Sequence, residues 1–264
     1  MKTSFNHGIM ISYHNLSPSV VAFSTTRHGG FSHGKHGEFN INRYCGDDEA
    51  CIKKNLDLLS RELGVDKAGI IMPHQTHGNE TRLIARDFMA LPSSVKNMLL
   101  EGVDALMTDV TGICIGVSTA DCIPIIIYDP EHHSAAAVHA GWRGTAARIA
   151  MKAVGDMRLA YGSRPESLRA VIGPGISLDA FEVGDEVYEE FASAGFDMEQ
   201  ISRRQGKWHI DLKECNRLQL TGLGIMPDNI QVSGICTYNS YNDYFSARRL
   251  GAQSGRIFTG VVLL

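Results

Sequence analysis

Cys122 and His139 stand at the ends of two neighbouring apolar runs. Cys122 follows Asp121 directly and precedes the run at 123–129, whereas His139 lies near the end of the run at 134–140, just before a glycine-rich turn. A thiolate is a strong nucleophile and a soft metal ligand, and an imidazole serves as a base or as a metal ligand. These two side chains are therefore the first candidates for chemistry.

The segment "PHQTHGNE" at 73–80 supplies His74 and His77 between two strand candidates. The glycine after His77 lets the backbone turn so that the imidazole faces inward. One thiolate and two imidazoles suit Zn²⁺, and three protein ligands leave a fourth position open for water, as in catalytic zinc sites. A structural zinc site needs a fourth ligand, usually in a CxxC or HxxxH pair, and the sequence has neither. Two alternatives remain: a buried thiol with hydrogen-bonded histidines, or a metal-free hydrolase with Cys122 as nucleophile and His139 as base.

Two carboxylates and one histidine outside the proposed ligand set each allow more than one interpretation. Asp121 either orients one of the histidines or caps the end of the strand, and we include it with Cys122 and His139 as a candidate catalytic residue. Glu182 in "FEVG" has the same ambiguity. His74 is expected to stabilise the site from outside the ligand set.

The segment "AGWRGT" at 140–145 predicts an anion site. Gly141 and Gly144 can bring backbone N–H groups to the positive end of a helix predicted at 145–160. Arg143 would add bidentate recognition of a phosphate or carboxylate. The alternative is an ordinary glycine-rich turn with a surface arginine.

Two further arginines lie in loop motifs, Arg27 in "STTRHGGFSHG" and Arg248 in "YFSARR". We expect at least two of Arg27, Arg143 and Arg248 to face the pocket of the metal ligands and to bind substrate there.

Short apolar runs alternate with amphipathic segments along the chain, which indicates an α/β protein. Several predicted strands follow each other without a helix, so mixed and stacked sheets flanked by helices fit better than a regular doubly wound fold. The predicted strands cover 20–25, 69–72, 80–85, 104–108, 112–118, 123–129, 134–140, 168–173, 229–234 and 256–264. The predicted helices cover 47–63, 145–160, 184–195 and 212–223.

Composition narrows the class of protein. The chain has 264 residues, 44% of them hydrophobic, and we expect one domain over 1–264. The net charge is −4 and the 25 Lys and Arg are scattered, so no nucleic-acid partner is expected. No apolar run is long enough to cross a bilayer or to act as a secretory signal, so we expect a cytoplasmic protein without a membrane partner. Its six cysteines are expected to be reduced thiols.

Several motifs together resemble the YfiH/YlmD family, also called laccase-domain or polyphenol oxidase family proteins. In chain order they are "FSTTRHGGFS", "HQTHG", "VDALMTD", "TADCIP", "VHAGWRGT", "IGPGIS", "FEVG" and "YFSARR". The resemblance implies a single α/β domain related to the catalytic domain of a bacterial cytotoxic deamidase. It also implies that His77, Cys122 and His139 are the metal ligands.

The same resemblance implies a zinc-dependent purine nucleoside phosphorylase. Such an enzyme cleaves adenosine, inosine, guanosine or methylthioadenosine with phosphate to the base and (methylthio)ribose 1-phosphate, and it has additional adenosine deaminase activity. A homodimer is possible. The sequence lacks the H-x-E…P-C-x-x-C signature of cytidine-type zinc deaminases, so deamination would use a different scaffold.

Two other classes of function remain open beside the cysteine hydrolase. A copper-dependent polyphenol oxidase is the first, although a multicopper site uses paired H-x-H ligands and none of the eleven histidines forms one. Cu²⁺ binds most N/S sites more tightly than Zn²⁺, so copper is a possible cofactor beside zinc. The second is a metal-stabilised binding protein without turnover, which would lose its fold when the ligands are removed.

Overall fold

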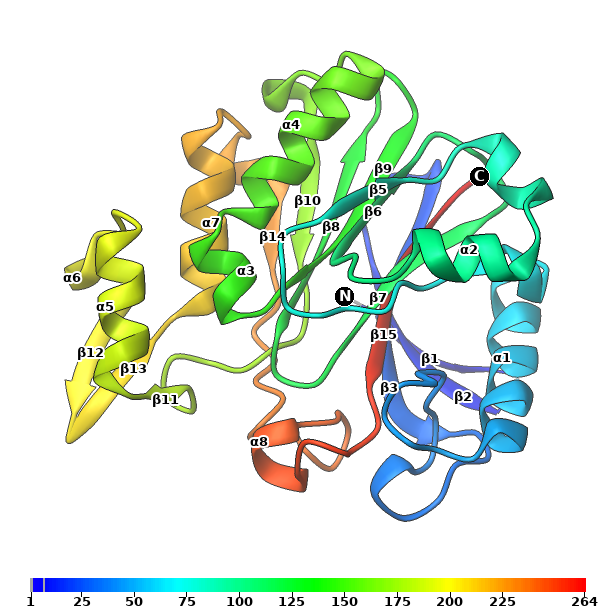
Figure 1. Ribbon diagram of the computed structural model, residues 1–264, viewed down its shortest axis with the longest axis horizontal. Helices are drawn as coiled ribbons and strands as arrows, with labels where there is room; N and C mark the ends of the chain where they lie inside the picture. Colours follow the sequence, from blue (N-terminus) through cyan, green and yellow to red (C-terminus); the bar gives the residue numbers. More distant parts are fainter. Residues whose placement is uncertain (1, 7) are drawn as a thin grey trace.

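The computed structural model describes residues 2–6 and 8–264, and it has two six-stranded sheets packed face to face with helices outside (Figure 1). The first sheet has the strand order β1 (Lys2–Asn6), β2 (Ile9–His14), β3 (Val20–Gly29), β15 (Ile257–Leu263), β7 (Cys114–Thr119) and β4 (Ile70–Ile71). The second has the order β14 (Ile230–Val232), β10 (Arg169–Ile172), β8 (Ile123–Asp129), β9 (Ser134–Ala140), β6 (Ala105–Thr108) and β5 (Thr81–Leu83). Both sheets are mixed, because β4 pairs parallel with β7, β5 with β6, and β14 with β10.

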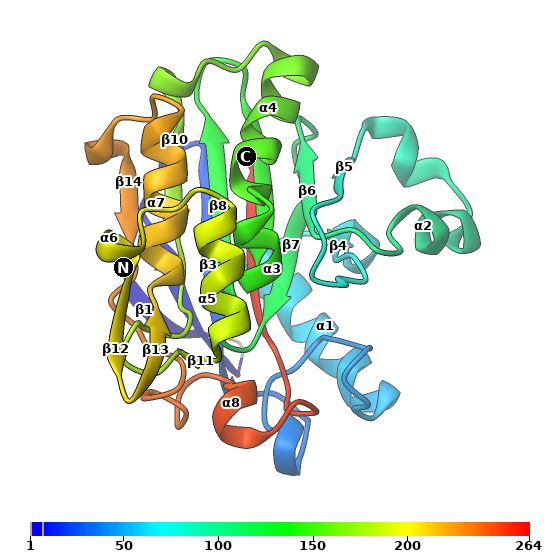
Figure 2. The same ribbon diagram turned by 60° about the vertical axis from the view of Figure 1, so that its left-hand side comes forward.

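Eight α-helices are present in the described residues. They are α1 (Glu49–Leu63), α2 (Ser93–Leu99), α3 (Trp142–Ala146), α4 (Ile149–Tyr161), α5 (Asp185–Ser193), α6 (Met198–Ile201), α7 (Leu212–Gly222) and α8 (Ala247–Leu250). A small third sheet of β11 (Glu182–Val183), β13 (Lys207–Ile210) and β12 (Ser202–Gln205) lies with α5 and α6 on the side of the molecule away from α1 (Figures 1 and 2). None of the helices in the described part of the chain is long and apolar enough to span a membrane.

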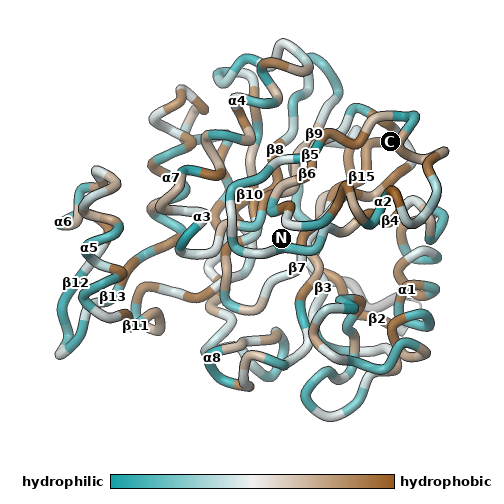
Figure 3. Tube along the Cα trace, viewed as in Figure 1, coloured by the Kyte–Doolittle hydropathy of each residue, from teal (hydrophilic) through white to brown (hydrophobic). Residues whose placement is uncertain are grey.

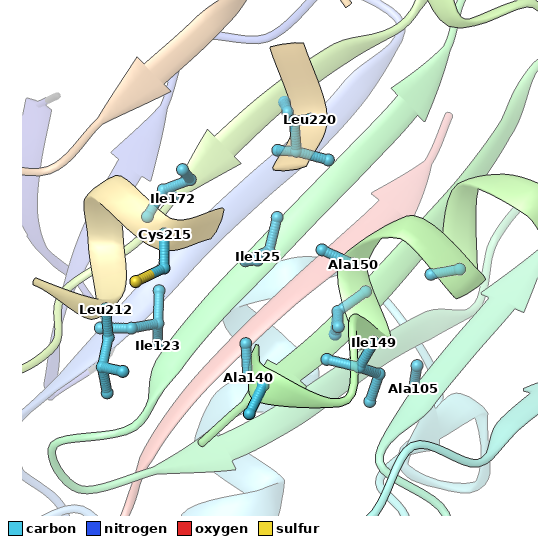
Figure 4. Packing of buried hydrophobic residues seen from close by; sticks show 14 of the residues in the cluster. Ala105, Ile123, Ile125, Ala140, Ile149, Ala150, Ile172, Leu212, Cys215 and Leu220 are labelled. Atoms are coloured by element: carbon cyan, nitrogen blue, oxygen red, sulfur yellow. The ribbon is translucent and has the colours of Figure 1, made fainter. Parts of the chain in front are cut away.

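The central strands are apolar throughout because both of their faces are buried. On β8, Ile126 packs between the two sheets, whereas Ile123 and Ile125 face outward against helices. The outward layer is closed by α4 and α7, with Ile149 and Leu220 against the second sheet (Figure 4). The hydropathy colouring shows the same distribution, with brown strands at the centre and teal loops around them (Figure 3). On the other side, α1 covers the outer face of the first sheet.

The predicted α/β class with stacked mixed sheets is confirmed, and each predicted strand corresponds to an observed one. The bounds agree closely for the fully buried strands β8 and β9, which coincide with the runs at 123–129 and 134–140. The prediction missed β1, β2, the third sheet and the short helices α2, α6 and α8. The short elements bury few residues, so they carry little periodic signal.

The single helix predicted at 145–160 is confirmed from Ile149 onward, but it is not continuous before that residue. The chain forms α3 and α4 instead, with Arg148 between them in the left-handed region at φ 62°. The Arg148 guanidinium donates a hydrogen bond to the carbonyl of Ala194 at 2.8 Å and lies over the Phe196 ring. These contacts with residues distant in sequence stabilise the interruption between α3 and α4, and no local feature of the sequence predicts it.

Candidate metal centre

His77, Cys122 and His139 converge at one end of the stacked sheets. One ligand atom from each side chain lies within 4.8 Å of the others. His77 lies in the connection from β4 to β5 and Cys122 in the connection from β7 to β8, and both connections pass from the first sheet to the second. His139 lies on β9, in the same alternation as Ala135 and Ala137, which face the first sheet. The three side chains therefore meet where the two sheets are joined.

The backbone beside the cluster is held in an uncommon conformation. His77 has φ 64° and Asp121 has φ 85°, both in the left-handed region that non-glycine residues rarely adopt. The backbone N–H of His77 donates to Asp104 at 3.1 Å. The Asp121 carboxylate accepts hydrogen bonds of 2.7 Å from the Thr237 hydroxyl and from the backbone N–H of Arg248. These bonds fix the two turns that carry His77 and Cys122.

Asp104 is a site residue that sequence reasoning did not identify. Its carboxylate lies 2.7 Å from Nδ1 of His139, and it also accepts hydrogen bonds from the backbone N–H groups of Thr76, His77 and Gly78. Because Nδ1 of His139 is bonded to this carboxylate, Nε2 is the nitrogen left for a metal or for Cys122. A signal was available: an aspartate at the start of the fully buried run "DALMT" requires a buried partner.

The charges within the cluster favour a thiolate. Burial by itself raises the pKa of the Cys122 thiol, but His139 and His77 outweigh it and lower that pKa to about 6. Burial likewise lowers the pKa of His139, but Cys122 and Asp104 outweigh it and raise that pKa to about 9. Burial also raises the pKa of Asp104, and its hydrogen bonds from His139 and the backbone outweigh that effect and lower it. The cluster thus favours the thiolate form of Cys122, which is the form that binds a metal cation or acts as a nucleophile.

The residues around the cluster fit a metal ion. A Cβ atom on Gly141 would lie 3.1 Å from Sγ of Cys122 and 3.1 Å from Cδ2 of His77, so only glycine leaves the space between these two side chains free. Gly141 has φ −68°, which means that space, and not backbone conformation, requires glycine here. One sulfur and two imidazole nitrogens form a donor set that suits Zn²⁺ or copper.

The cluster forms part of the wall of a cavity of about 300 Å³. Tyr44 and His74 form another part, with their rings stacked at a centroid distance of 4.0 Å, and Nδ1 of His74 lies 2.7 Å from Glu101. His74 thus lies beside the proposed ligands and outside the group that can hold a metal, and its stabilising role stays a prediction. The cavity is lined by Asn42, Tyr44, Cys45, His74, Gln75, His77, Ser118, Thr119, Ala120, Cys122, His139, Ala247, Ala252 and Arg256.

At least two of Arg27, Arg143 and Arg248 were expected at the pocket, but none of the three lines the cavity that contains the proposed ligands. Arg27 donates to the backbone carbonyls of Gly37 and Tyr241, and the Arg248 side chain donates to the carbonyl of Glu182. Arg143 lies over the Trp142 ring and lines a neighbouring cavity. Their roles in substrate binding stay predictions.

The cavity beside Arg143 shares one wall with the first cavity, because His77 lines both. The arginine in the first cavity is Arg256, which sequence reasoning missed although it directly precedes the last apolar strand.

The two carboxylates considered in the sequence make hydrogen bonds or ion pairs of other kinds. The Asp121 carboxylate accepts a hydrogen bond from Thr237, in the segment after β14, and the Glu182 carboxylate pairs with Lys207 at the surface. The catalytic role of Asp121 likewise stays a prediction.

Residues 21–264 match the model of a family described as multi-copper polyphenol oxidoreductase laccase. The chain belongs to this family. A relative from Bacteroides thetaiotaomicron named purine nucleoside phosphorylase is 42% identical over 259 residues and covers 96% of both chains. Adenosine deaminase RL5, from an unknown prokaryotic organism, is 43% identical over 245 residues, which are 92% of this chain and 93% of that protein.

Two solved structures have the same fold as this chain. YfiH from Bacillus licheniformis has a TM-score of 0.89 at 27% identity and covers 99% of both chains. YlmD from Geobacillus stearothermophilus has a TM-score of 0.88 at 28% identity and covers 97% of this chain and 96% of its own. The family resemblance read from the motifs is confirmed.

Proposed function

We propose that the protein is a zinc-dependent purine nucleoside phosphorylase that also deaminates adenosine. The observation that carries this proposal is the His77, Cys122 and His139 cluster in the wall of a cavity, in a chain 42% identical to a purine nucleoside phosphorylase. The relatives at this level of identity bear enzyme names, which confirms the expectation of an enzyme. Adenosine, inosine, guanosine and methylthioadenosine are the proposed nucleosides.

When bound, a zinc ion at this cluster supplies a Lewis acid that polarises an oxygen or lowers the pKa of a water molecule. Asp104 keeps the His139 ring oriented, so that its Nε2 faces the cluster. The stacked rings of Tyr44 and His74 offer an aromatic surface in the same cavity, where a purine can stack. Arg143 lines the second cavity, which His77 also borders, and its guanidinium can hold an oxygen of the substrate there.

Zinc is favoured over copper as the working metal. The described residues contain one group of three or more His, Cys, Asp or Glu side chains able to hold a metal, whereas multicopper oxidation needs several sites. Copper found on the purified protein would not identify copper as the working metal, because Cu²⁺ binds most N/S sites more tightly than Zn²⁺ does.

A metal-free cysteine hydrolase is the second candidate, and one observation favours it. Hydrogen bonds connect the Cys122 thiol to the His139 imidazole and the imidazole to the Asp104 carboxylate, which is the order of a nucleophile, its base and the group that orients the base. This arrangement assigns no role to His77.

The deciding experiment combines metal analysis with turnover. Protein purified without added metal is analysed for zinc and copper, and the release of purine base and of ammonia from adenosine is measured with and without phosphate. About one zinc per chain, with base release that requires phosphate, is expected. Full turnover by protein stripped of metal would reject the zinc mechanism and support the cysteine hydrolase.

A further inference from the structure

We propose that Arg256 and Thr119 form the phosphate-binding subsite of the metal cavity. The inference rests on the proposed function, and it names the side chains that hold the anionic co-substrate. Both residues line the cavity that contains His77, Cys122 and His139. Neither was among the substrate-binding residues expected from the sequence.

Strand register places the two residues together. β15 pairs antiparallel with β7, and Ile257 lies opposite Thr119. Arg256 directly precedes Ile257, and the chain continues from Thr119 through Ala120 and Asp121 to Cys122. Arg256, one residue before β15, and Thr119, the last residue of β7, therefore lie at the same end of two adjacent strands, where the first sheet meets the ligand-bearing connection, and both line the cavity.

Thr119 has a buried hydroxyl without a partner. The residue is 1% exposed, and its Oγ1 makes no hydrogen bond to any described residue. In the alternation of β7, Thr119 follows Ile115 and Val117, which face the second sheet and thus the side on which His139 lies. Buried hydroxyls are almost always hydrogen-bonded. The Thr119 hydroxyl, unlike the equally unpartnered hydroxyl of Ser134, borders the metal cavity, where a ligand can supply its acceptor.

Arg256 brings a fixed positive charge to the same cavity. Its guanidinium donates to the backbone carbonyls of Ala252 at 2.6 Å, Gly255 at 3.1 Å and Ser254. These carbonyls hold the side chain in place but leave its charge uncompensated, because no described carboxylate forms an ion pair with it. A positioned guanidinium and a free hydroxyl donor in the wall of one cavity suit a tetrahedral phosphate group.

The subsite assigns a task to each side chain in phosphorolysis. One phosphate oxygen forms the bond to C1′ of the ribose while the bond from C1′ to the purine nitrogen breaks, and the purine leaves with the electron pair and takes up a proton. Arg256 and Thr119 bind the oxygens that do not attack, which holds the phosphate in the cavity beside the metal ligands.

The test uses Thr119→Val and Arg256→Gln in the full-length protein. Thr119→Val keeps the β-branched shape of the side chain and removes only an unpartnered hydroxyl, so stability is expected to be unchanged or higher. Ser134→Ala is the matched control, because Ser134 Oγ is also buried and unpartnered but lies at the opposite end of β9 from His139. Should Arg256→Gln fail to fold, Thr119→Val decides the outcome.

Two measurements are made on each protein: the KM for inorganic phosphate in adenosine phosphorolysis, and the calorimetric affinity for inorganic phosphate alone. We expect the KM for phosphate to rise about 10-fold in Thr119→Val and about 100-fold in Arg256→Gln, with smaller changes in the KM for adenosine. Phosphate affinity falls in parallel, and Ser134→Ala behaves as wild type. A parallel titration with adenosine 5′-monophosphate separates inorganic phosphate from a nucleotide phosphate group as the ligand.

Unchanged phosphate KM and affinity in both variants of an enzyme that performs phosphorolysis would overturn the subsite and leave the proposed function intact. A wild-type protein that binds phosphate through Arg256 and Thr119 but cleaves no nucleoside would uphold the subsite and reject the proposed function. If the variants lose affinity for adenosine 5′-monophosphate and not for inorganic phosphate, the assignment of the co-substrate is wrong.

Discussion

The Asp104 carboxylate lies 2.7 Å from Nδ1 of His139, and the backbone N–H of His139 donates to the Asp104 carbonyl at 2.8 Å. The same carboxylate accepts hydrogen bonds from three consecutive backbone N–H groups of the loop that carries His77. One buried side chain therefore orients one proposed ligand directly and fixes the loop of another.

Asp104→Asn tests this positioning role. The amide keeps the size of the side chain but loses the negative charge that orients His139, so we expect metal affinity to fall about 10-fold to 100-fold. Competition for zinc with a chromophoric chelator measures the affinity. Asp109→Asn, at an exposed position after the same strand, is the control and should bind zinc as wild type does. An Asp104→Asn protein with wild-type zinc affinity would contradict the role of Asp104.

His77→Ala separates the zinc mechanism from the cysteine hydrolase. His77 is a proposed ligand, but it has no required part in a thiol, imidazole and carboxylate arrangement. We expect bound zinc to decrease and phosphate-dependent adenosine cleavage to fall below about 1% of wild type. Circular dichroism should show an intact fold, because a core of this size does not depend on one metal. Replacing the exposed His33 by Ala is the control, and full activity of metal-free His77→Ala would reject the zinc mechanism.

Gly141→Ala tests the space at the cluster. The added Cβ would lie 3.1 Å from both Cys122 Sγ and His77 Cδ2, so the two side chains have to separate. We expect zinc affinity to fall about 10-fold or more while the protein stays folded. Gly155→Ala is the control, because a Cβ there meets nothing within 4 Å, and alanine should stabilise α4 by up to about 1 kcal/mol. Equal zinc affinity in the two variants would mean that the cluster tolerates the methyl group.

We expect His14, which lies far from the cluster in sequence, to make a contribution to stability that is lost at acidic pH. Its Nε2 lies 2.9 Å from Ser24 Oγ on the neighbouring strand, and burial lowers the pKa of the imidazole from 6.5 to about 4. The unfolded chain therefore binds more protons than the folded protein between these values, and stability is lost as the pH falls through that window. Protonation of His14 is expected to remove on the order of 2–3 kcal/mol between about pH 7 and about pH 4.

Urea unfolding across this pH range measures the effect by comparing wild type with His14→Gln. The free energy of unfolding of the variant should fall less steeply with decreasing pH, whereas replacing the exposed His33 by Gln should leave the wild-type slope. Parallel slopes for wild type and His14→Gln would show that the imidazole of His14 titrates alike in the folded and unfolded states.

The sequence by itself determined the class of fold and the types of the ligands. β8 and β9 have the bounds of the apolar runs at 123–129 and 134–140, because a strand buried on both faces is apolar at every position. Cys122 and His139 could be identified as candidate site residues because reactive side chains at the ends of such runs lie at the edge of the core. The resemblance to the family then added His77, and the structure brings the three residues together.

Only the tertiary structure decided which residues surround this cluster. Asp104 meets His139 because β6 pairs with β9, and Arg256 reaches the cavity because β15 pairs with β7. The partners in these pairs are far apart along the chain, and their register depends on the packing of the two sheets against each other and against α1, α4 and α7. A local sequence pattern does not determine that register. Arginines in loop motifs, such as Arg27, Arg143 and Arg248, were therefore expected at the pocket, whereas Arg256, beside the last strand, was not.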